Sequence, residues 1–376
     1  MLDKGWLDEK NYACLSQKIE KIRLESGVPY LDVSVYRRHE NAFRYLSGEG
    51  VTGKELYYMY SCSKPVTVTA AMQLIERGLL SLDDAVEKYL PEIKDAFIIE
   101  NGERVTVGDK IKISHLFTMT AGFSYQLKND AVEEMLKDKG ESARLRDYIA
   151  PLVKSPLLFY PGARFEYSLC HDILAAVIET VSGVRFSRYV NENIFAPLKM
   201  THSLFDNSER EEDMAPLYMA SGDGKVEKSN EKKILIPNKG YESGGAGLVS
   251  TVEDYARFAD ALASGGVSRD GVRILKEESV KAFTREYIAN LFVDSGYTCW
   301  QGEDYGYGLG MRVRTKKTDY NLPVGEFGWD GAAGAFLLVD PVNEISVVIG
   351  MHVRGWPTVF KGKYLEIVKH IYEKLL

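Results

Sequence analysis

The sequence predicts an α+β fold: one antiparallel sheet flanked by N- and C-terminal helices, with an inserted helical domain. Strand-like runs lie near both ends of the chain, and the long middle part has mainly helical periodicity. With 376 residues, 45% of them apolar, the chain can build one large or two interleaved domains with a full core. We expect the sheet domain at 1–60 and 240–376, the helical domain at 61–239, and the active site in the crevice between them.

The first elements are expected to be a helix and a hairpin. Residues 7–24 have helical spacing of apolar side chains with charges on the other face, and Gly27 and Pro29 follow as helix breakers. Residues 30–36 and 43–46 are rich in β-branched and aromatic residues, which favours strands. The helix is therefore expected to lie on the hairpin.

The remaining elements follow from periodicity and from Gly and Pro punctuation. A polar stretch at 206–239, rich in charged residues, Gly and Asn, has the composition of a variable loop. Helices are expected at 66–77, 142–152, 169–181, 186–195, 252–263 and 364–375, and strands at 308–314, 335–339 and 345–353.

Composition and charge exclude several classes of function. A formal net charge of −7 gives no general attraction for phosphate backbones or anionic lipid, so neither nucleic acid nor a membrane surface is an expected partner. No stretch reaches the roughly 18 apolar residues of a spanning helix. The first 26 residues are too charged for a secretory signal, and we expect a soluble, cytoplasmic protein.

Cysteine and histidine spacing predicts no metal site. The four cysteines are far apart, without the paired spacing of a zinc site or the density of a disulfide framework, so reduced thiols are expected. The six histidines form no His-x-x-x-His pair, and no His-Glu pair that would place two ligands on one helical face. We expect neither a metal nor a cofactor, and the sequence does not predict an oligomeric state. The cysteines are Cys14, Cys62, Cys170 and Cys299.

The pattern Ser-x-x-Lys occurs twice, at Ser61 to Lys64 and at Ser229 to Lys232. Ser229 stands in a charge run without an apolar face, which predicts a surface loop. Ser61 precedes an apolar helix, and Pro65 suits the first turn of that helix, where a missing N–H costs least. Residues three apart share a helical face, so the Ser61 hydroxyl and the Lys64 amine can meet. A partly desolvated lysine can then take the proton of the serine.

Two further segments bear on whether Ser61 is a nucleophile or only a helix cap. Residues 161–169 place Tyr167 directly before an apolar helix. Residues 327–336 combine small residues with a following strand, as close approach of a backbone to a ligand requires. Taken singly, these segments also fit a tyrosine packed at a helix start and a Gly-rich turn between strands.

In this order and at these separations, the three segments resemble the motifs of the serine β-lactamase and penicillin-binding superfamily. The likeness is strongest to its class C β-lactamase-like branch and to the family VIII carboxylesterases. Residues 113–122 and 244–251 are similar to further stretches of these proteins, so the resemblance extends from about 30 to 353. It implies the β-lactamase/transpeptidase-like fold and a small-molecule acyl substrate.

The resemblance also implies roles for individual residues. Ser61 would be the acylated nucleophile, Lys64 its activating amine and Tyr167 a general acid/base. The backbone N–H groups of Ser61 and Ala332 would form the oxyanion hole, whose donors typically contribute ~3 to 4 kcal/mol each to the transition state.

Departures from the family motifs favour esters over antibiotics. Trp329, Asp330 and Gly331 would bind substrate in place of the family's Lys-Thr-Gly, without its cation. Asp330 either faces the substrate or points outward and caps the turn. Tyr167 begins Tyr-Ser-Leu instead of Tyr-x-Asn, so the amide that would hold an acyl-amide substrate is absent. We expect a carboxylesterase-like serine hydrolase; the alternatives are a β-lactamase or D-amino-acid peptidase or amidase of the superfamily, and a catalytically inactive scaffold or sensor.

Overall fold

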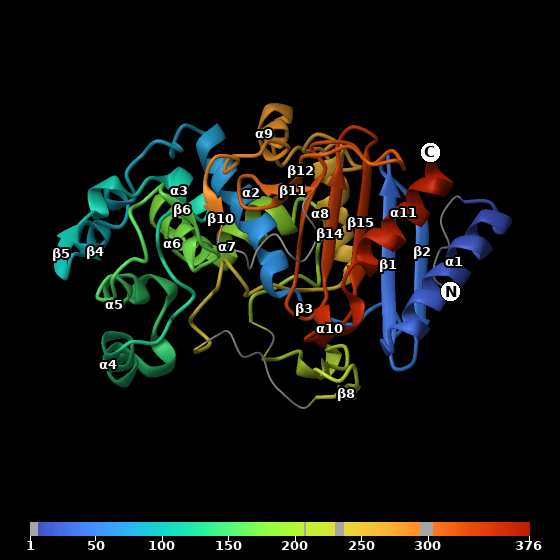
Figure 1. The fold of residues 1–376 in the computed structure, drawn as a ribbon, viewed down its shortest axis with the longest axis horizontal. Helices are drawn as coiled ribbons and strands as arrows, with labels where there is room; N and C mark the ends of the chain where they lie inside the picture. Colours follow the sequence, from blue (N-terminus) through green and yellow to red (C-terminus); the bar gives the residue numbers. More distant parts are fainter. Residues whose placement is uncertain (1–6, 207, 230–236, 294–303) are drawn as a thin grey trace.

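A seven-stranded antiparallel sheet forms the centre of the computed structural model, which describes residues 7–206, 208–229, 237–293 and 304–376. The strand order is β11-β12-β13-β14-β15-β1-β2 (Figure 1). Both ends of the chain contribute to this sheet, which confirms the prediction. The strands are β1 (Tyr30–Arg37), β2 (Glu40–Gly48), β11 (Tyr305–Tyr307), β12 (Arg312–Arg314), β13 (Phe327–Asp330), β14 (Phe336–Asp340) and β15 (Ile345–Gly350).

Helices cover both faces of the sheet. The N-terminal helix α1 (Glu9–Glu25) and the C-terminal helix α11 (Lys363–Leu375) share one apolar cluster with β1, β2, β14 and β15. On the other face, α8 (Val252–Ala263) packs against β1, β14 and β15. The Thr251 side chain accepts a hydrogen bond from the backbone N–H of Asp254 and so caps α8 at its predicted start. Because both faces are covered, β14 and β15 are apolar and buried over nearly their whole length.

The second part of the molecule is mainly helical and lies beside the sheet, at the left in Figure 1. Its centre is the packing of α2 (Ser63–Glu76) on α6 (Cys170–Ser182). Around this pair lie α3 (Ile113–Phe117), α4 (Asp130–Lys139), α5 (Ile149–Leu152) and α7 (Phe186–Val190). The α+β fold with a helical region is therefore confirmed. The predicted domain boundaries, after residues 60 and 239, stay predictions. The first lies just after β3 (Tyr57–Tyr58) and the second lies before β9 (Val249–Ser250), and these two strands pair with each other.

Three predicted elements are interrupted in the structure. The helix expected at 142–152 is a 3₁₀ turn followed by the short α5. The strand expected at 308–314 is a turn before β12, because Gly310 has a φ of +85°, which extended backbone does not allow. The strand expected at 345–353 ends at Gly350, and β16 (Val353–Arg354) leaves the sheet to pair with β7 (Tyr218–Ala220).

Several short elements were not predicted. The stretch 206–239 contains β7 and β8 (Val226–Lys228), so its described part is more than a loop. Helix α4 has apolar residues at helical spacing that the sequence reading did not use, and β13 lies within the Gly-rich segment 327–336. Further unpredicted elements include β9, β11, β4 (Phe97–Glu100), β5 (Glu103–Thr106), β6 (Arg164–Phe165), β10 (Phe292–Val293), α9 (Glu277–Phe283) and α10 (Pro357–Phe360).

Candidate active site

Ser61 lies where the sheet meets the helical region. The chain leaves β3 and turns at Tyr60, whose φ of +45° lies in the left-handed region that non-glycine residues rarely adopt. Ser61 follows in the 3₁₀ turn Tyr60–Cys62, directly before α2, and is 9% exposed. The strained turn therefore presents the hydroxyl at the mouth of a helix, where developing negative charge is favoured.

Lys64 lies one turn further along and points at Ser61. Its Nζ is 3.1 Å from Ser61 Oγ and donates a hydrogen bond of 2.7 Å to the Gly245 carbonyl. The side chain is fully buried. Burial lowers the pKa of Lys64 to about 7, against the opposing effect of the nearby Asp172 carboxylate. Near neutral pH the amine is therefore partly unprotonated and able to accept the serine proton.

Tyr167 approaches Ser61 from the helical region. Its hydroxyl donates to Ser61 Oγ at 2.7 Å and accepts from Trp329 Nε1 at 3.2 Å. The ring is stacked between Tyr125 and Trp329, each with its centroid 5.6 Å away. Lys64 Nζ lies 4.6 Å from the centroid of the Tyr167 ring. Burial raises the pKa of Tyr167 above its usual range, so the phenol stays protonated at neutral pH.

The end of β13 lies against the residues that precede Ser61. A Cβ at Gly331 would lie 2.5 Å from the Met59 carbonyl oxygen, so only glycine allows this approach. Trp329, in the same strand, reaches Tyr167. Ala332, which is exposed, follows in the otherwise buried turn between β13 and β14. The structure thus brings Trp329, Gly331 and Ser61 into one site, with Ala332 beside them.

The side chain of Asp330 is directed elsewhere. Successive side chains of a strand point to opposite faces, and Trp329 takes the face toward Tyr167. The Asp330 carboxylate accepts a hydrogen bond of 3.3 Å from Nη1 of the buried Arg312, whose guanidinium lies over the Phe336 ring. A contribution of Asp330 to substrate binding would therefore come from its backbone, and its binding role stays a prediction.

Sequence reasoning missed three residues of this site: Tyr125, Asp172 and Gly245. Tyr125 stacks on Tyr167, Asp172 is a buried carboxylate near Lys64, and Gly245 supplies the carbonyl that Lys64 binds. The available signals were weak: an aromatic residue in an unassigned loop, an acidic residue in the first turn of a helix, and a glycine among glycines.

A pocket of about 480 Å³ adjoins the site. Tyr125, Leu169, Asp172 and Ala246 form the part of its wall nearest to Lys64 and Tyr167, and Leu127, Val132 and Leu136 are among its apolar lining residues. Its volume lies in the range of small-molecule sites.

The second Ser-x-x-Lys pair has a different setting. Ser229 lies next to β8, where its backbone N–H donates to the Leu217 carbonyl at 2.8 Å. Lys232 lies outside the described residues, as does Cys299. Cys14, Cys62 and Cys170 are free thiols.

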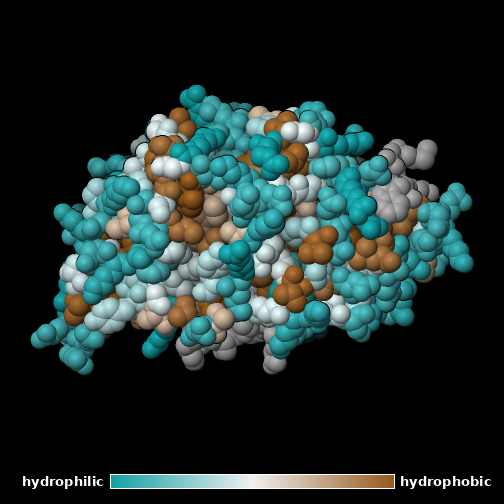
Figure 2. Space-filling view, turned by 90° about the horizontal axis from the view of Figure 1, so that it is seen from above, coloured by the Kyte–Doolittle hydropathy of each residue, from teal (hydrophilic) through white to brown (hydrophobic). Residues whose placement is uncertain are grey.

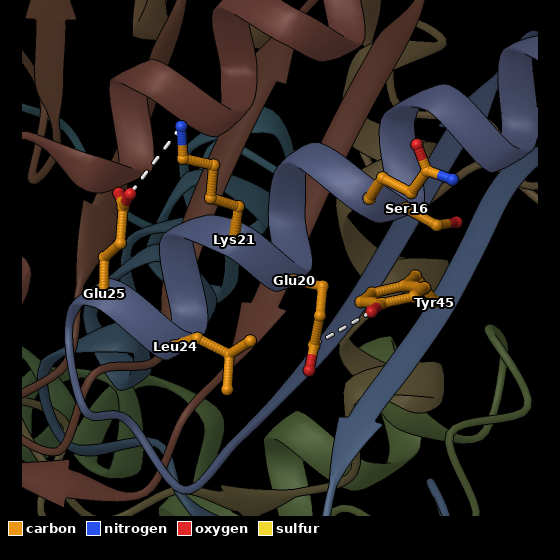
Figure 3. Close-up of a pocket in the computed structure, with 7 residues that line it drawn as sticks. Ser16, Glu20, Lys21, Leu24, Glu25 and Tyr45 are labelled. Carbon is orange, nitrogen blue, oxygen red and sulfur yellow. Dashed lines mark hydrogen bonds and ion pairs between the residues drawn. The ribbon is translucent and has the colours of Figure 1, made fainter.

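A shallow groove of about 580 Å³ runs between α1 and β2 (Figure 3). Its charged side chains are engaged with neighbours on the same surface: Lys21 pairs with Glu25 at 3.7 Å, and Glu20 accepts from the Tyr45 hydroxyl at 3.0 Å. The ion pair with Arg23 lowers the pKa of Glu20 to about 2, so this carboxylate is a poor base. The Ser61 site is the better place for hydrolytic chemistry.

Two other kinds of feature are absent from the described ranges. No cluster of three or more His, Cys, Asp or Glu side chains in 7–206, 208–229, 237–293 and 304–376 is arranged to hold a metal ion. Within the same ranges no helix combines the length and the apolar character needed to cross a membrane. On the face seen in Figure 2, hydrophilic side chains surround scattered apolar patches.

The pKa of Lys64 predicts the pH dependence of the site. A Lys64 that serves as the base must be neutral, so kcat/KM should then fall ~10-fold per pH unit below about 7 and level off above it. The raised pKa of Tyr167 predicts that this phenol causes no second fall before strongly alkaline pH. Initial rates with a neutral ester between pH 5 and 9.5 measure the profile. An acid limb near pH 4 to 5 would identify a carboxylate, and not Lys64, as the base.

Comparison with known proteins identifies the family of the chain. The Beta-lactamase family model matches residues 15–369. Esterase EstB of Burkholderia gladioli is 26% identical over 93% of this chain and 91% of its own length. A putative D-alanyl-D-alanine carboxypeptidase of Escherichia coli is 27% identical over 78% of this chain and 68% of its own.

Solved structures show the same fold. EstCE1, described as a hydrolase with promiscuous acyltransferase activity, superposes with a TM-score of 0.77 at 24% identity, over 96% of this chain and 99% of its own. The simvastatin synthase LovD of Aspergillus terreus gives a TM-score of 0.76 at 19% identity, over 96% and 98%. The family match covers nearly the whole chain and includes the site around Ser61. The chain therefore belongs to the Beta-lactamase family and is a serine hydrolase of that family.

Proposed function

We propose that the protein hydrolyses carboxylic esters through an acyl-enzyme on Ser61. The observation that carries the proposal is a single serine hydroxyl within hydrogen-bond distance of both a buried amine and a tyrosine hydroxyl. Such a serine has a base to activate it and an acid to serve the leaving group.

The reaction follows from this geometry. Lys64 takes the proton of Ser61 as Oγ forms a bond to the ester carbonyl carbon, and the backbone N–H groups of Ser61 and Ala332 stabilise the resulting oxyanion. The C–O bond to the alcohol then breaks, and Tyr167 donates a proton to the leaving oxygen and recovers one from Lys64. In the second half of the reaction, water gives a proton to Lys64 and Tyr167 and attacks the acyl carbon. The bond to Ser61 Oγ then breaks, the serine takes that proton back, and the carboxylic acid is released.

Two features of the site support an ester with a neutral acyl group. Leu169 occupies the position where the family's amidases and β-lactamases carry an asparagine, and it lines the adjoining pocket with an apolar side chain. Trp329 occupies the position of the family's lysine, so the site lacks a cation there for a substrate carboxylate. The pocket would hold the apolar part of the acyl chain. The esterase name of the Burkholderia relative agrees with this proposal.

The alternatives are a β-lactamase or a D-amino-acid peptidase or amidase, and an inactive scaffold. The carboxypeptidase name of the Escherichia coli relative favours the peptidase, whereas the predicted cytoplasmic location does not. The hydrogen-bonded Ser61, Lys64 and Tyr167 argue against a scaffold, because an unused site would not maintain two bonds to one hydroxyl.

Substrate charge is the test of the ester proposal. We expect short neutral esters to be hydrolysed much faster than penicillins or peptides that end in D-Ala-D-Ala. The comparison is of kcat/KM for p-nitrophenyl butyrate, a penicillin and a D-Ala-D-Ala peptide. Penicillin hydrolysis as fast as that of the best ester would replace the esterase assignment by a β-lactamase.

Asp330→Gly tests whether the Asp330 carboxylate acts on the substrate; the side chain is buried beside Arg312 and does not point outward, as the second expectation had it. Because the carboxylate contacts Arg312, we expect the ratio of kcat/KM for neutral and carboxylate-bearing esters to stay unchanged. Stability should fall, by up to about 3 kcal/mol, because the buried Arg312 loses one acidic partner and keeps Glu326. A variant that gains more than ~10-fold selectivity for anionic esters would show that Asp330 acts on the substrate.

A further inference from the structure

Asp172 is a buried carboxylate beside Lys64 that the proposed reaction does not use. It lies in the first turn of α6, five residues after Tyr167, and is 2% exposed. A Cβ at Gly245 would lie 2.6 Å from Asp172 Oδ2 and 3.5 Å from Lys64 Nζ, so both charged groups lie against the same glycine. The lack of a side chain at position 245 allows this approach.

The turn 243–246 connects Asp172 to Lys64. Ser243 Oγ donates to Asp172 Oδ1 at 2.5 Å and accepts from the Ala246 backbone N–H at 2.9 Å. The Gly245 carbonyl, in the middle of this turn, accepts from Lys64 Nζ at 2.7 Å. The direction of that carbonyl, and with it the position of the amine, therefore depends on a turn that Asp172 holds.

Asp172 also differs in charge from the other groups around Lys64. Burial raises the pKa of each surrounding thiol and phenol, which stay neutral, and lowers the pKa of His171 to about 3, so the imidazole is uncharged. Burial raises the pKa of Asp172 too, but the Ser243 hydrogen bond and the charge of Lys64 oppose it. Asp172 is the carboxyl among these groups, and the Ser243 hydrogen bond and the charge of Lys64 both favour its anionic form. The groups are Ser61, Cys62, Tyr125, Tyr167, Cys170, His171 and Asp172.

We propose that Asp172 is a positioning residue that orients the Gly245 carbonyl toward Lys64 and stabilises the ammonium form of Lys64 after it has taken the serine proton. The inference rests on the proposed role of Ser61 and Lys64. It explains how a fully buried lysine holds a proton long enough to pass it to Tyr167, which protonates the leaving group. Without a nearby anion, burial alone would make the amine a weak base.

The test is the pH dependence of Ser61 labelling by a fluorophosphonate in the Asp172→Asn variant, followed by intact mass. Asparagine keeps the shape and removes the charge, so protonated Lys64 loses its stabilising partner. Loss of this partner lowers the pKa of Lys64, so the neutral amine persists at lower pH. The acid limb, the pH range in which the labelling rate falls, should therefore move down by about one pH unit. The labelling rate on the plateau above the acid limb should fall ~10-fold, because the side-chain N–H₂ group of the new asparagine would lie against the Gly245 backbone and disturb its position.

Asp254→Asn is the matched control. Asp254 is also a buried carboxylate in the first turn of a helix, and burial raises its pKa as well, but it accepts from the His202 backbone N–H, at 2.6 Å. This variant should lose stability without moving the acid limb. Ser243→Ala keeps the carboxylate and removes its bond to the turn, so its plateau should fall several-fold.

The outcomes separate the inference from the proposed function. An acid limb that stays in place, or moves to higher pH, in Asp172→Asn would overturn the inference while labelling of Ser61 still upheld the hydrolase. If Asp172→Asn does not fold, an unchanged plateau in Ser243→Ala overturns the inference. Absence of labelling in the unmodified protein at every pH would remove the proposed function and the inference with it.

Discussion

Ser61→Ala is expected to abolish ester hydrolysis, with a loss of several orders of magnitude in kcat. The alanine removes the hydroxyl oxygen to which both Lys64 and Tyr167 are hydrogen-bonded, so neither has a serine proton to move. Ser61 is nearly buried and its hydroxyl is small, so the fold should tolerate the change. Steady-state kinetics with a p-nitrophenyl ester and a thermal unfolding curve measure the two effects.

Ser229→Ala is the matched control, because it removes the serine of the second Ser-x-x-Lys pair. Ser229 donates its backbone N–H to Leu217 near β8, and alanine retains that bond. Its activity should equal that of the unmodified protein. Appreciable turnover by a folded Ser61→Ala protein would show that Ser61 is not the nucleophile.

Lys64→Ala and Tyr167→Phe should each lower kcat by ~100-fold or more, as loss of general acid/base catalysis typically does. Both side chains contact the same Ser61 oxygen, and the Lys64 amine lies above the Tyr167 ring. Groups that form one proton path are not independent, so the double variant should lose much less than the product of the single losses. A double-mutant cycle on kcat measures this coupling.

Tyr125→Phe is the control for the cycle. It keeps the aromatic ring that stacks on Tyr167 and removes the hydroxyl, which interacts with Ser61 but stays protonated because burial raises its pKa. It should cost far less than Tyr167→Phe. Strictly multiplicative losses for Lys64→Ala and Tyr167→Phe would mean that the two residues do not share a proton path.

Local sequence rules were sufficient where the geometry is local. The approach of Lys64 to Ser61 follows from the three-residue spacing on a helix, and Pro65 marked its first turn correctly, although α2 begins at Ser63. The helix at Val252–Ala263 was predicted to the residue, because Thr251 caps it and its apolar side chains recur at helical spacing. The place of Tyr167 came from the family resemblance, since no spacing rule connects positions 61 and 167.

Tertiary contacts decided what the sequence could not predict. β13 contains a glycine and an aspartate, and it is a strand because β12 and β14 pair with it on both sides. The same pairing turns Asp330 toward Arg312, a choice that the residues around it left open. Asp172 and Tyr125 reach the site only through the packing of α6 and the loop before α4, so neither has a sequence signal of its own.

The central claim, that Ser61 is the residue acylated during hydrolysis, is tested most directly by intact-mass spectrometry with peptide mapping. The protein is incubated separately with a fluorophosphonate and with a penicillin. We predict one fluorophosphonate adduct per chain, on the peptide that carries Ser61, absent from Ser61→Ala and retained in Ser229→Ala, with little or slow modification by penicillin. A stoichiometric adduct on any other residue, or no adduct on the folded protein, would contradict the account.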